Sequence, residues 1–474
     1  MRPSPFYLNG RWQSSSRTRP VVNPYNGQTV AEVCQASADE IDQAIEGAVE
    51  AFSATRSLTS HQRHSILLQI SHEINDRKEE LAGLITSETG KPISSARGEA
   101  ERAVFTFQTA AEEAKRIGGE IIPLDLSPGP GGRIGLIRRF PLGPVAGITP
   151  FNFPLNLVAH KVGPALAAGN SIVLKPSSSA PSVALALASI VHSTELPKGA
   201  FSVLPCLASE ADQLIIDQRL KLISFTGSPA VGWPIKEKAG KKRVLLELGG
   251  NAGVIVDYDA NLDLALPRII WGSYGNAGQS CIAVQRVFVH SSLYETFLSR
   301  FVELSRLVPA GDPANERTVV GPMITEEAAV KVEGWIREAV AGGAKILCGG
   351  KRAGALLEPT VLVDVEPNMS VCAEEVFAPV VTVEGFSDCA DAVARVNESK
   401  YGLQAGLFSN SMNHILHAFE HLEVGGVIVN DVPTYRIDHM PYGGVKDSGF
   451  GREGVKYAIE EMTEMKLLGM NIVG

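Results

Sequence analysis

The stretch Leu220-Lys221-Leu222-Ile223-Ser224-Phe225-Thr226-Gly227-Ser228 is a short apolar run that ends at a glycine turn. Further apolar runs lie between residues 145 and 256, where they alternate with segments of helical pattern. They are Val145 to Ile148, Ser171 to Leu174, Phe201 to Leu204 and Val244 to Leu248. Such alternation is typical of a doubly wound parallel α/β sheet, so we expect a Rossmann-like domain here.

The segments on either side have different patterns. The preceding residues are mostly helical in pattern, and Ser37 to Glu40 reads as a capping box. From Ile121 to Phe140, two β-like runs flank Ser127-Pro128-Gly129-Pro130-Gly131-Gly132, which predicts a hairpin tip or an exposed ribbon. A second α/β series follows, with Val287 to Val289, Val361 to Val363, Val380 to Val383 and Val427 to Asn430. The predicted fold class is therefore α/β, with two α/β domains and a projecting β-ribbon.

Composition limits the classes of function. The 474 residues suffice for two or three domains, and 45% of them are hydrophobic and 20% charged. A formal net charge of −9 argues against a nucleic-acid or anionic-membrane partner. The cysteines at 34, 206, 281, 348, 372 and 389 form no Cys-x-x-Cys, so we expect neither a disulfide framework nor a metal site. No apolar leader or membrane-length run is apparent, which favours a cytoplasmic location.

Three short motifs carry residues suited to covalent acyl chemistry. Cys281 ends Gly278-Gln279-Ser280-Cys281, Glu247 lies in Leu246-Glu247-Leu248-Gly249-Gly250, and Asn152 lies in Thr149-Pro150-Phe151-Asn152-Phe153-Pro154. A thiol, a carboxylate and an amide donor are the groups that a thioester route requires. Each residue also has a structural interpretation: an inert buried cysteine, a surface carboxylate or a turn asparagine. For the other five cysteines, the structural interpretation is the better one.

Further motifs accompany these three along the chain. They are Asn9 to Trp12, Asn23 to Gly27, Lys175-Pro176-Ser177-Ser178, Phe225 to Ser228, Glu375-Val376-Phe377-Ala378-Pro379 and Pro441 to Gly449. In this order and over nearly the whole chain, the set resembles the aldehyde dehydrogenase superfamily. The resemblance implies a cofactor-binding domain at 1–117 and 142–248 and a catalytic domain at 249–437. It also implies an oligomerisation element at 118–141 and 456–474, and hence a homodimer or homotetramer.

The resemblance also implies an activity, the NAD(P)-dependent oxidation of an aldehyde to a carboxylic acid. Cys281 would attack the aldehyde, Asn152 would stabilise the oxyanion, and Glu247 would activate the water that hydrolyses the thioester. Lys161 matches a lysine near the active site of relatives. Glu247 also distinguishes the chain from coenzyme-A-acylating relatives, which typically lack Glu at this position.

The cofactor residues implied by the resemblance lie in several of these motifs. They are Thr149, Pro150, Phe151, Lys175, Ser178, Gly227, Ser228, Gly232, Leu248, Glu375 and Phe377. The literal Gly-x-Gly-x-x-Gly at residues 449–454 has no clear strand before it, so we expect it to have no role in dinucleotide binding. Ser178 stands where NAD-preferring relatives often carry Glu, which leaves both NAD and NADP open.

Polar residues that are candidates for the substrate pocket are Arg102, His160, Arg286, Arg436 and His439. A guanidinium among them would suit a short polar or anionic aldehyde, such as a semialdehyde, lactaldehyde or a phosphonylated aldehyde. The alternative is that most of them are structural. Two other functions also stay open: a thiol esterase that uses Cys281, Asn152 and Glu247, and a non-catalytic binding protein with the same fold.

Overall fold

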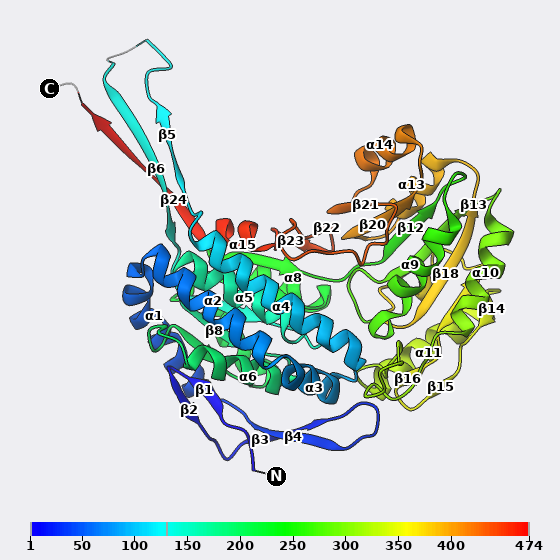
Figure 1. Ribbon diagram of the computed structural model, residues 1–474, viewed down its shortest axis with the longest axis horizontal. Helices are drawn as coiled ribbons and strands as arrows, with labels where there is room; N and C mark the ends of the chain where they lie inside the picture. The colour runs from blue at the N-terminus through cyan, green and yellow to red at the C-terminus, as the bar shows by residue number, and fades with distance from the viewer. Residues whose placement is uncertain (1, 129–130, 473–474) are drawn as a thin grey trace.

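The computed structural model describes residues 2–128 and 131–472, and it contains an eight-stranded sheet whose strands come from residues 6–247 apart from β23 (Figure 1). The strand order is β2-β1-β9-β8-β7-β10-β11-β23, and the five strands from β9 to β11 are parallel. The bounds are β1 Phe6–Leu8, β2 Arg11–Gln13, β7 Val145–Ile148, β8 Ile172–Lys175, β9 Phe201–Val203, β10 Leu222–Thr226, β11 Arg243–Glu247 and β23 Gly449–Phe450. Each apolar run predicted between residues 145 and 248 forms one of these strands, which confirms the doubly wound sheet.

Helices cover the first sheet and share one hydrophobic core with it. They are α1 Ala38–Ser57, α2 Ser60–Asp76, α3 Lys78–Thr89, α4 Ile93–Ala114, α5 Asn156–Ala168, α6 Pro181–His192, α7 Ala208–Ile216, α8 Pro229–Lys238 and α15 Val455–Glu461. The capping box predicted at Ser37 to Glu40 is confirmed, with both reciprocal hydrogen bonds formed at the start of α1. None of the helices within residues 2–128 and 131–472 is long and apolar enough to cross a bilayer.

A second, seven-stranded sheet has the order β14-β17-β18-β13-β12-β20-β21, and only its edge strand β14 is antiparallel. Its strands are β12 Ala252–Val256, β13 Val284–His290, β14 Lys345–Cys348, β17 Thr360–Val363, β18 Val380–Phe386, β20 Gln404–Phe408 and β21 Gly426–Val429. The helices around it are α9 Leu262–Tyr274, α10 Tyr294–Arg306, α11 Glu326–Ala341, α12 Ser370–Ala373, α13 Cys389–Asn397 and α14 Met412–His421. Short pairs complete the fold: β3 Thr18–Val22 with β4 Thr29–Cys34, β15 Arg352–Ala353 with β16 Leu356–Leu357, and β19 Tyr401–Gly402 with β22 Val445–Lys446.

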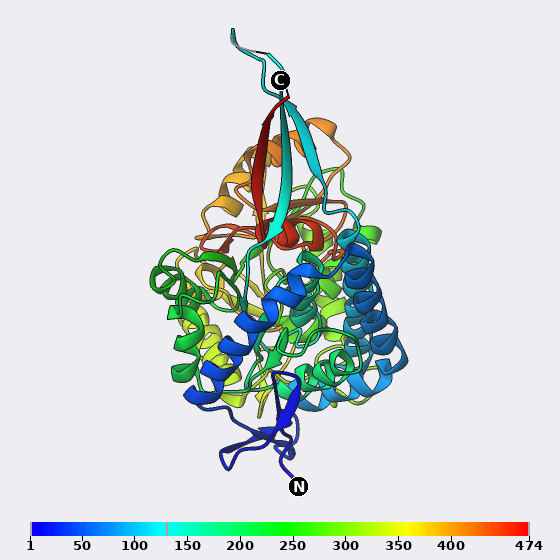
Figure 2. The ribbon, with the colours of Figure 1, turned by 90° about the vertical axis from the view of Figure 1, so that its left-hand side faces the viewer.

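A three-stranded ribbon projects from the rest of the molecule (Figures 1 and 2). It consists of β5 Gly119–Pro123, β6 Arg133–Pro141 and β24 Thr463–Asn471. Part of the predicted hairpin tip, residues 129 and 130, lies outside the described residues. The C-terminal part of the ribbon begins at Thr463, because α15 before it packs against α5 and the first core. The division into domains and the role of the ribbon in assembly stay predictions.

The carboxyl edge of the first sheet faces the amino edge of the second sheet. β11 ends at Glu247 and β12 begins at Ala252, so the chain passes directly from the carboxyl edge of the first sheet to the amino edge of the second. Cys281 lies just before β13, and Glu375 lies just before β18. This arrangement brings the predicted catalytic residues of both halves to one boundary.

Candidate active site

A cavity of about 680 Å³ lies at the boundary between the two sheets. Its lining includes Cys281, Glu247 and Asn152, which come from three separate segments of the chain. Thr226, the last residue of β10, also lines it, as does Tyr442 from the C-terminal region. The three residues predicted to carry acyl chemistry therefore meet in one cavity.

Tight backbone contacts around Cys281 explain the glycines of its motif. The turn before it holds Asn276, Ala277 and Gly278 at φ of 54°, 55° and 67°. A Cβ on Gly278 would lie 2.2 Å from the carbonyl oxygen of Ala378, and one on Gly250 would lie 2.0 Å from that of Cys281. The glycines of both motifs thus allow the backbone segments to approach closely and place the thiol in the cavity.

The thiol of Cys281 forms a hydrogen bond with a tyrosine that was not predicted. Its Sγ lies 2.9 Å from the Oη of Tyr442, and the guanidinium of Arg436 lies 3.6 Å from the centre of the Tyr442 ring. Cys281 is half-buried, whereas the other five cysteines are buried. Burial raises the pKa of Cys281 to about 12, and the hydrogen bond from Tyr442 opposes this increase.

Glu247 combines burial with an unpartnered oxygen. It is the last residue of β11, it is 4% exposed, and its Oε2 has no hydrogen-bond partner among the described residues. Burial raises the pKa of Glu247 well above its ordinary value, and the nearby carboxylate of Glu453 raises it further, against the opposing charge of Arg436. A carboxyl group in this state can accept a proton from water near neutral pH more readily than an ordinary glutamate.

Asn152 is held in a rigid loop before α5. Its Nδ2 donates to the carbonyl oxygen of Gln279 at 3.1 Å, which leaves its second N–H for another acceptor. The carboxylate of Glu99 accepts from the backbone N–H groups of Leu155 and Asn156 at the start of α5. Glu99 is paired with the buried Lys91, whose ammonium lies 3.8 Å from the ring centre of Phe153. These contacts fix the loop that carries the amide.

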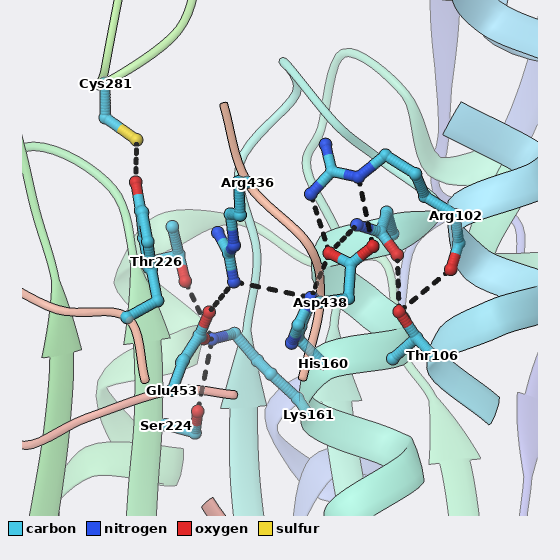
Figure 3. Close-up of polar contacts among 12 residues, drawn as sticks. Arg102, Thr106, His160, Lys161, Ser224, Thr226, Cys281, Arg436, Asp438 and Glu453 are labelled. Atoms are coloured by element: carbon cyan, nitrogen blue, oxygen red, sulfur yellow. Dashed lines mark hydrogen bonds and ion pairs between the residues drawn. The ribbon is translucent and has the colours of Figure 1, made fainter. Parts of the chain in front are cut away.

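Buried ionic groups extend from the cavity toward α4 (Figure 3). Lys161 on α5 donates to Ser224 at 3.1 Å, Thr226 at 2.8 Å and Glu453 at 3.1 Å, and it does not itself line the cavity. Arg436 lies 3.5 Å from Glu453 and 3.3 Å from Nε2 of His160. These groups are nearly excluded from water, so their charges act on one another strongly.

Asp438 organises the outer part of this network. It accepts from Arg102 at 2.6 and 3.1 Å, from Asn156 at 3.0 Å, and it contacts His160 at 2.8 Å. Hydrogen bonds and the nearby positive charge keep the pKa of Asp438 low despite its burial. Burial and the charge of Arg436 lower the pKa of His160, which favours a neutral imidazole.

Two of the five predicted substrate residues, Arg102 and Arg436, line the cavity. Arg286, predicted as a substrate residue, does not line this cavity. Its guanidinium donates instead to Asn251 and to the backbone carbonyls of Arg395 and Val396, which connects β13 to these neighbouring segments. His160 lies behind Arg436 and does not reach the lining. His439 is exposed beside Phe105 and is likewise absent from the lining.

Seven of the predicted cofactor residues line the same cavity. Those in the lining are Pro150, Phe151, Gly227, Ser228, Leu248, Glu375 and Phe377. The carboxylate of Glu375 accepts from the backbone N–H of Gly250 at 2.9 Å, and burial raises the pKa of Glu375 to about 7. Phe377 meets Phe151 edge to face at 6.0 Å between ring centres.

The remaining cofactor candidates, Thr149, Lys175, Ser178 and Gly232, lie outside this lining. Thr149 and Lys175 are at or next to the carboxyl ends of β7 and β8, and a Cβ on Gly232 would lie 2.4 Å from Leu248. β7 and β10 adjoin where the strand order reverses, which is where dinucleotides bind in such sheets. The Oγ1 of Thr149 is buried there without a partner among the described residues, which fits a polar ligand at this point.

The literal Gly-x-Gly-x-x-Gly segment has a different environment. Gly449 and Phe450 form β23, an antiparallel edge strand that pairs with β11. Up to residue 472, the seven-residue α15 and the ribbon strand are all the regular structure that follows it. This segment therefore does not form a βαβ unit, as expected from the sequence.

Comparisons with known proteins agree with this arrangement. The sequence model described as the aldehyde dehydrogenase family matches residues 12–468. A 3-sulfolactaldehyde dehydrogenase from Priestia megaterium is 45% identical over 468 residues, which are 98% of each chain. The solved structure of aldehyde dehydrogenase 21 from Physcomitrella patens, in complex with the reaction product succinate, has a TM-score of 0.98 at 47% identity and full coverage of both chains.

A second solved structure includes a bound nucleotide. It is glyceraldehyde-3-phosphate dehydrogenase from Methanocaldococcus jannaschii complexed with NADP, with a TM-score of 0.92 and 40% identity. The match covers 96% of this chain and all of the other.

Proposed function

This chain belongs to the aldehyde dehydrogenase family, and from that premise we propose that it oxidises a short aldehyde bearing one anionic group to the carboxylic acid. It is an NAD(P)-dependent enzyme. The observation that carries the proposal is the single cavity that joins Cys281, Glu247 and Asn152 to the guanidinium groups of Arg102 and Arg436.

Cys281 is the proposed nucleophile. Its Sγ adds to the aldehyde carbon, and the carbonyl oxygen becomes an anion that the second N–H of Asn152 can bind. Burial raises the pKa of this thiol, so its proton passes to solvent as the sulfur attacks, and the Tyr442 hydroxyl is placed to stabilise the thiolate. When bound, NAD(P)+ would supply the hydride acceptor, and loss of hydride from the thiohemiacetal on Cys281 gives the thioester.

Glu247 is the proposed general base for thioester hydrolysis. Its unpartnered Oε2 and raised pKa suit the removal of a proton from an attacking water. Lys161 serves in this proposal as a positioning residue, because it holds Glu453, whose charge raises the pKa of Glu247. Glu453 also stabilises the positive charge of Arg436, because its carboxylate lies 3.5 Å from the guanidinium.

For the cofactor, the proposed contacts lie at the switch point of the first sheet. Those in the cavity lining that would contact the nicotinamide and pyrophosphate half are Pro150, Phe151, Gly227, Ser228, Leu248, Glu375 and Phe377. Thr149, directly after β7, would lie beside them. Gly232 gives close packing of α8 on Leu248. Lys175 and Ser178 would face the adenosine ribose, and a serine at 178 offers no carboxylate to repel a 2′-phosphate, so we propose that NADP is accepted as well as NAD.

The charge of the cavity wall favours an anionic substrate. The network holds three cations, Lys161, Arg102 and Arg436, but only two carboxylates of low pKa, Asp438 and Glu453. His160 and Glu247 have pKa values shifted toward their neutral forms. The guanidinium groups of Arg102 and Arg436 both line the cavity, and a carboxylate, sulfonate or phosphate on the aldehyde would meet them there. The substrates or products named for the three compared proteins carry such groups.

We test the proposal with initial rates of NAD+ and NADP+ reduction on matched pairs of neutral and anionic short aldehydes. We expect kcat/KM to be about 10–100-fold higher for the anionic member, and turnover to require Cys281. Cys281→Ala serves as the inactive variant, and Cys34→Ala, at a buried cysteine of the first core, as its matched control. Equal kcat/KM for both members would contradict the substrate class. Ester hydrolysis without any nucleotide reduction would instead favour a thiol esterase.

Assembly is a separate part of the proposal. The ribbon strand β24 exposes Met465, Leu467, Leu468 and Met470, each more than a third accessible in the single chain. Exposed apolar strands of this kind are usually covered by a partner. We therefore propose a homodimer or a homotetramer, which light scattering would distinguish from a monomer.

A further inference from the structure

The carboxyl edge of the second sheet carries a cluster of polar side chains on the side away from the catalytic cavity. Asp257 follows β12, Ser409 follows β20, and Cys389 begins α13 after β18. The strand order reverses between β12 and β20, so this is the topological switch point of the second sheet. Ligands of open parallel sheets bind at such points, at the carboxyl ends of the strands.

Three side chains at this edge could ligate a metal. The carboxylate of Asp257, the Sγ of Cys389 and a ring nitrogen of His414 all lie within 4.8 Å of one another. Across residues 2–128 and 131–472, no other group of at least three His, Cys, Asp or Glu side chains meets that condition. Asp257 is 1% exposed and Cys389 is 5% exposed, whereas the His414 side chain is 34% exposed and opens the cluster to solvent.

The hydrogen bonds at this edge orient the carboxylate and leave the thiol free. Oδ2 of Asp257 accepts from Ser409 at 2.9 Å and lies 2.6 Å from Nδ1 of His414, and Oδ1 accepts from the N–H of Tyr258 at 2.9 Å. Cys389 has no hydrogen-bond partner among the described residues, although it lies beside this carboxylate. A cation would satisfy the sulfur and the carboxylate together.

We propose that Asp257, Cys389 and His414 form a binding site for a divalent cation of the zinc class. Thiolate and imidazole favour Zn²⁺ over Mg²⁺ or Ca²⁺, and a carboxylate is a regular third ligand. A water reaching the cluster beside His414 completes the coordination, because this side is open to solvent. The cysteine spacing did not indicate the site, since the three ligands come from segments far apart in the sequence.

Binding of the ion needs only modest movement of the three ligand side chains, whose ligand atoms already lie within 4.8 Å of one another. In tetrahedral zinc sites, neighbouring ligand atoms lie about 3.3–3.6 Å apart, from metal–ligand distances of about 2.0–2.3 Å. The Asp257 and His414 atoms separate slightly as the metal replaces the shared proton, and the Cys389 sulfur moves inward. The thiol gives its proton to the buffer, so binding weakens as pH falls. The bound ion would join β12, α13 and α14, the helix that exposes Met412, Leu416 and Phe419.

The test uses the full chain with the substitution Cys281→Ala, which removes the catalytic thiol as a competing ligand. Co²⁺ is titrated as a spectroscopic probe for Zn²⁺, and we expect one equivalent per chain with a thiolate-to-cobalt charge-transfer band that Zn²⁺ abolishes. Adding Cys389→Ser or His414→Gln should weaken Zn²⁺ binding at least about 10-fold. Adding Cys34→Ser, at another buried cysteine, should leave it unchanged.

Two outcomes would overturn the proposal: a charge-transfer band that survives Cys389→Ser, and Zn²⁺ binding equally weak in all variants. Circular dichroism without metal shows whether each variant is folded. X-ray absorption at the zinc edge of the Cys281→Ala protein needs no ligand variant, and it should show one sulfur ligand. A shell of nitrogen and oxygen alone would also refute the site. Because the test does not use turnover, it is independent of the proposed function.

Discussion

The two parallel sheets use their edges differently. The first sheet places Thr226 and Glu247 at its carboxyl edge, directly in the candidate active-site cavity. The second sheet turns its amino edge to the same cavity and supplies Cys281 and Glu375 from the loops that precede its strands. Its own carboxyl edge points elsewhere and carries the Asp257, Cys389 and His414 cluster.

Ligands of parallel α/β sheets bind at the carboxyl ends of the strands, and this difference shows that the rule has to be applied to each sheet separately. In the first sheet, the rule predicts the dinucleotide site at the carboxyl ends of the strands, beside the cavity. Cys281, the proposed nucleophile, lies at the amino edge of the second sheet, where the rule does not predict a ligand site. Its position follows instead from the glycine contacts that press Gly250 and Gly278 against neighbouring backbone.

The largest expected effect is at the carboxyl edge of the first sheet. Glu247→Gln should reduce steady-state kcat by about 10²–10⁴-fold, because thioester hydrolysis loses its base. In the unaltered enzyme, the raised pKa of Glu247 means that kcat should increase with pH as the carboxyl ionises. In the variant, this increase should disappear. A variant with the same pH profile and rate as the unaltered enzyme would assign the base elsewhere.

Asn152→Ala tests the loop that follows the central strand of the first sheet. Loss of the amide should reduce kcat about 10²–10³-fold, with nucleotide affinity unchanged. Stopped-flow measurement of the first turnover separates this effect from hydrolysis. If the substitution changed only KM, Asn152 would bind the ground state and not the oxyanion.

Arg102→Gln probes the charge of the cavity wall. We expect kcat/KM for anionic aldehydes to decrease about 10–100-fold, with little change for matched neutral aldehydes. Arg268→Gln is the control, since that arginine also pairs with an aspartate, Asp431, but lies outside the cavity. Equal losses for both classes of aldehyde would indicate a structural effect on Asp438.

The smallest effect is expected from Tyr442→Phe, which removes one hydrogen bond at the second sheet's amino edge. The Tyr442 hydroxyl lowers the pKa of Cys281, so its loss should raise that pKa and slow alkylation of the thiol by iodoacetamide about 10-fold near neutral pH. Cys389→Ser, at the opposite edge of that sheet, should leave the alkylation rate of Cys281 unchanged. A faster reaction in Tyr442→Phe would show that the ring shields the sulfur.

Much of the fold was predictable because strands and helices depend on local periodicity. The apolar runs from Val145 to Leu248 are the strands of the first sheet, and the capping box at Ser37 starts α1. The motifs around Cys281, Glu247 and Asn152 likewise indicated residues that meet in one cavity.

Contacts between distant segments were not predictable in the same way. Tyr442 reaches Cys281 across 161 positions, and Asp438 reaches Arg102 across 336. Arg286 has the residue type of a substrate ligand, but its place inside β13 directs its guanidinium to backbone carbonyls. Only the packing of the two sheets decides which polar residues face the cavity.

The central claim is that a thioester forms on Cys281 within this cavity. Mass spectrometry of Glu247→Gln, quenched after incubation with the preferred aldehyde and NAD(P)+, tests it most directly. We predict an adduct on the peptide containing Cys281, with the mass of the aldehyde less two hydrogen atoms, because formation continues while hydrolysis is slowed. No adduct while the aldehyde is still consumed, or an adduct confined to another cysteine, would contradict the account.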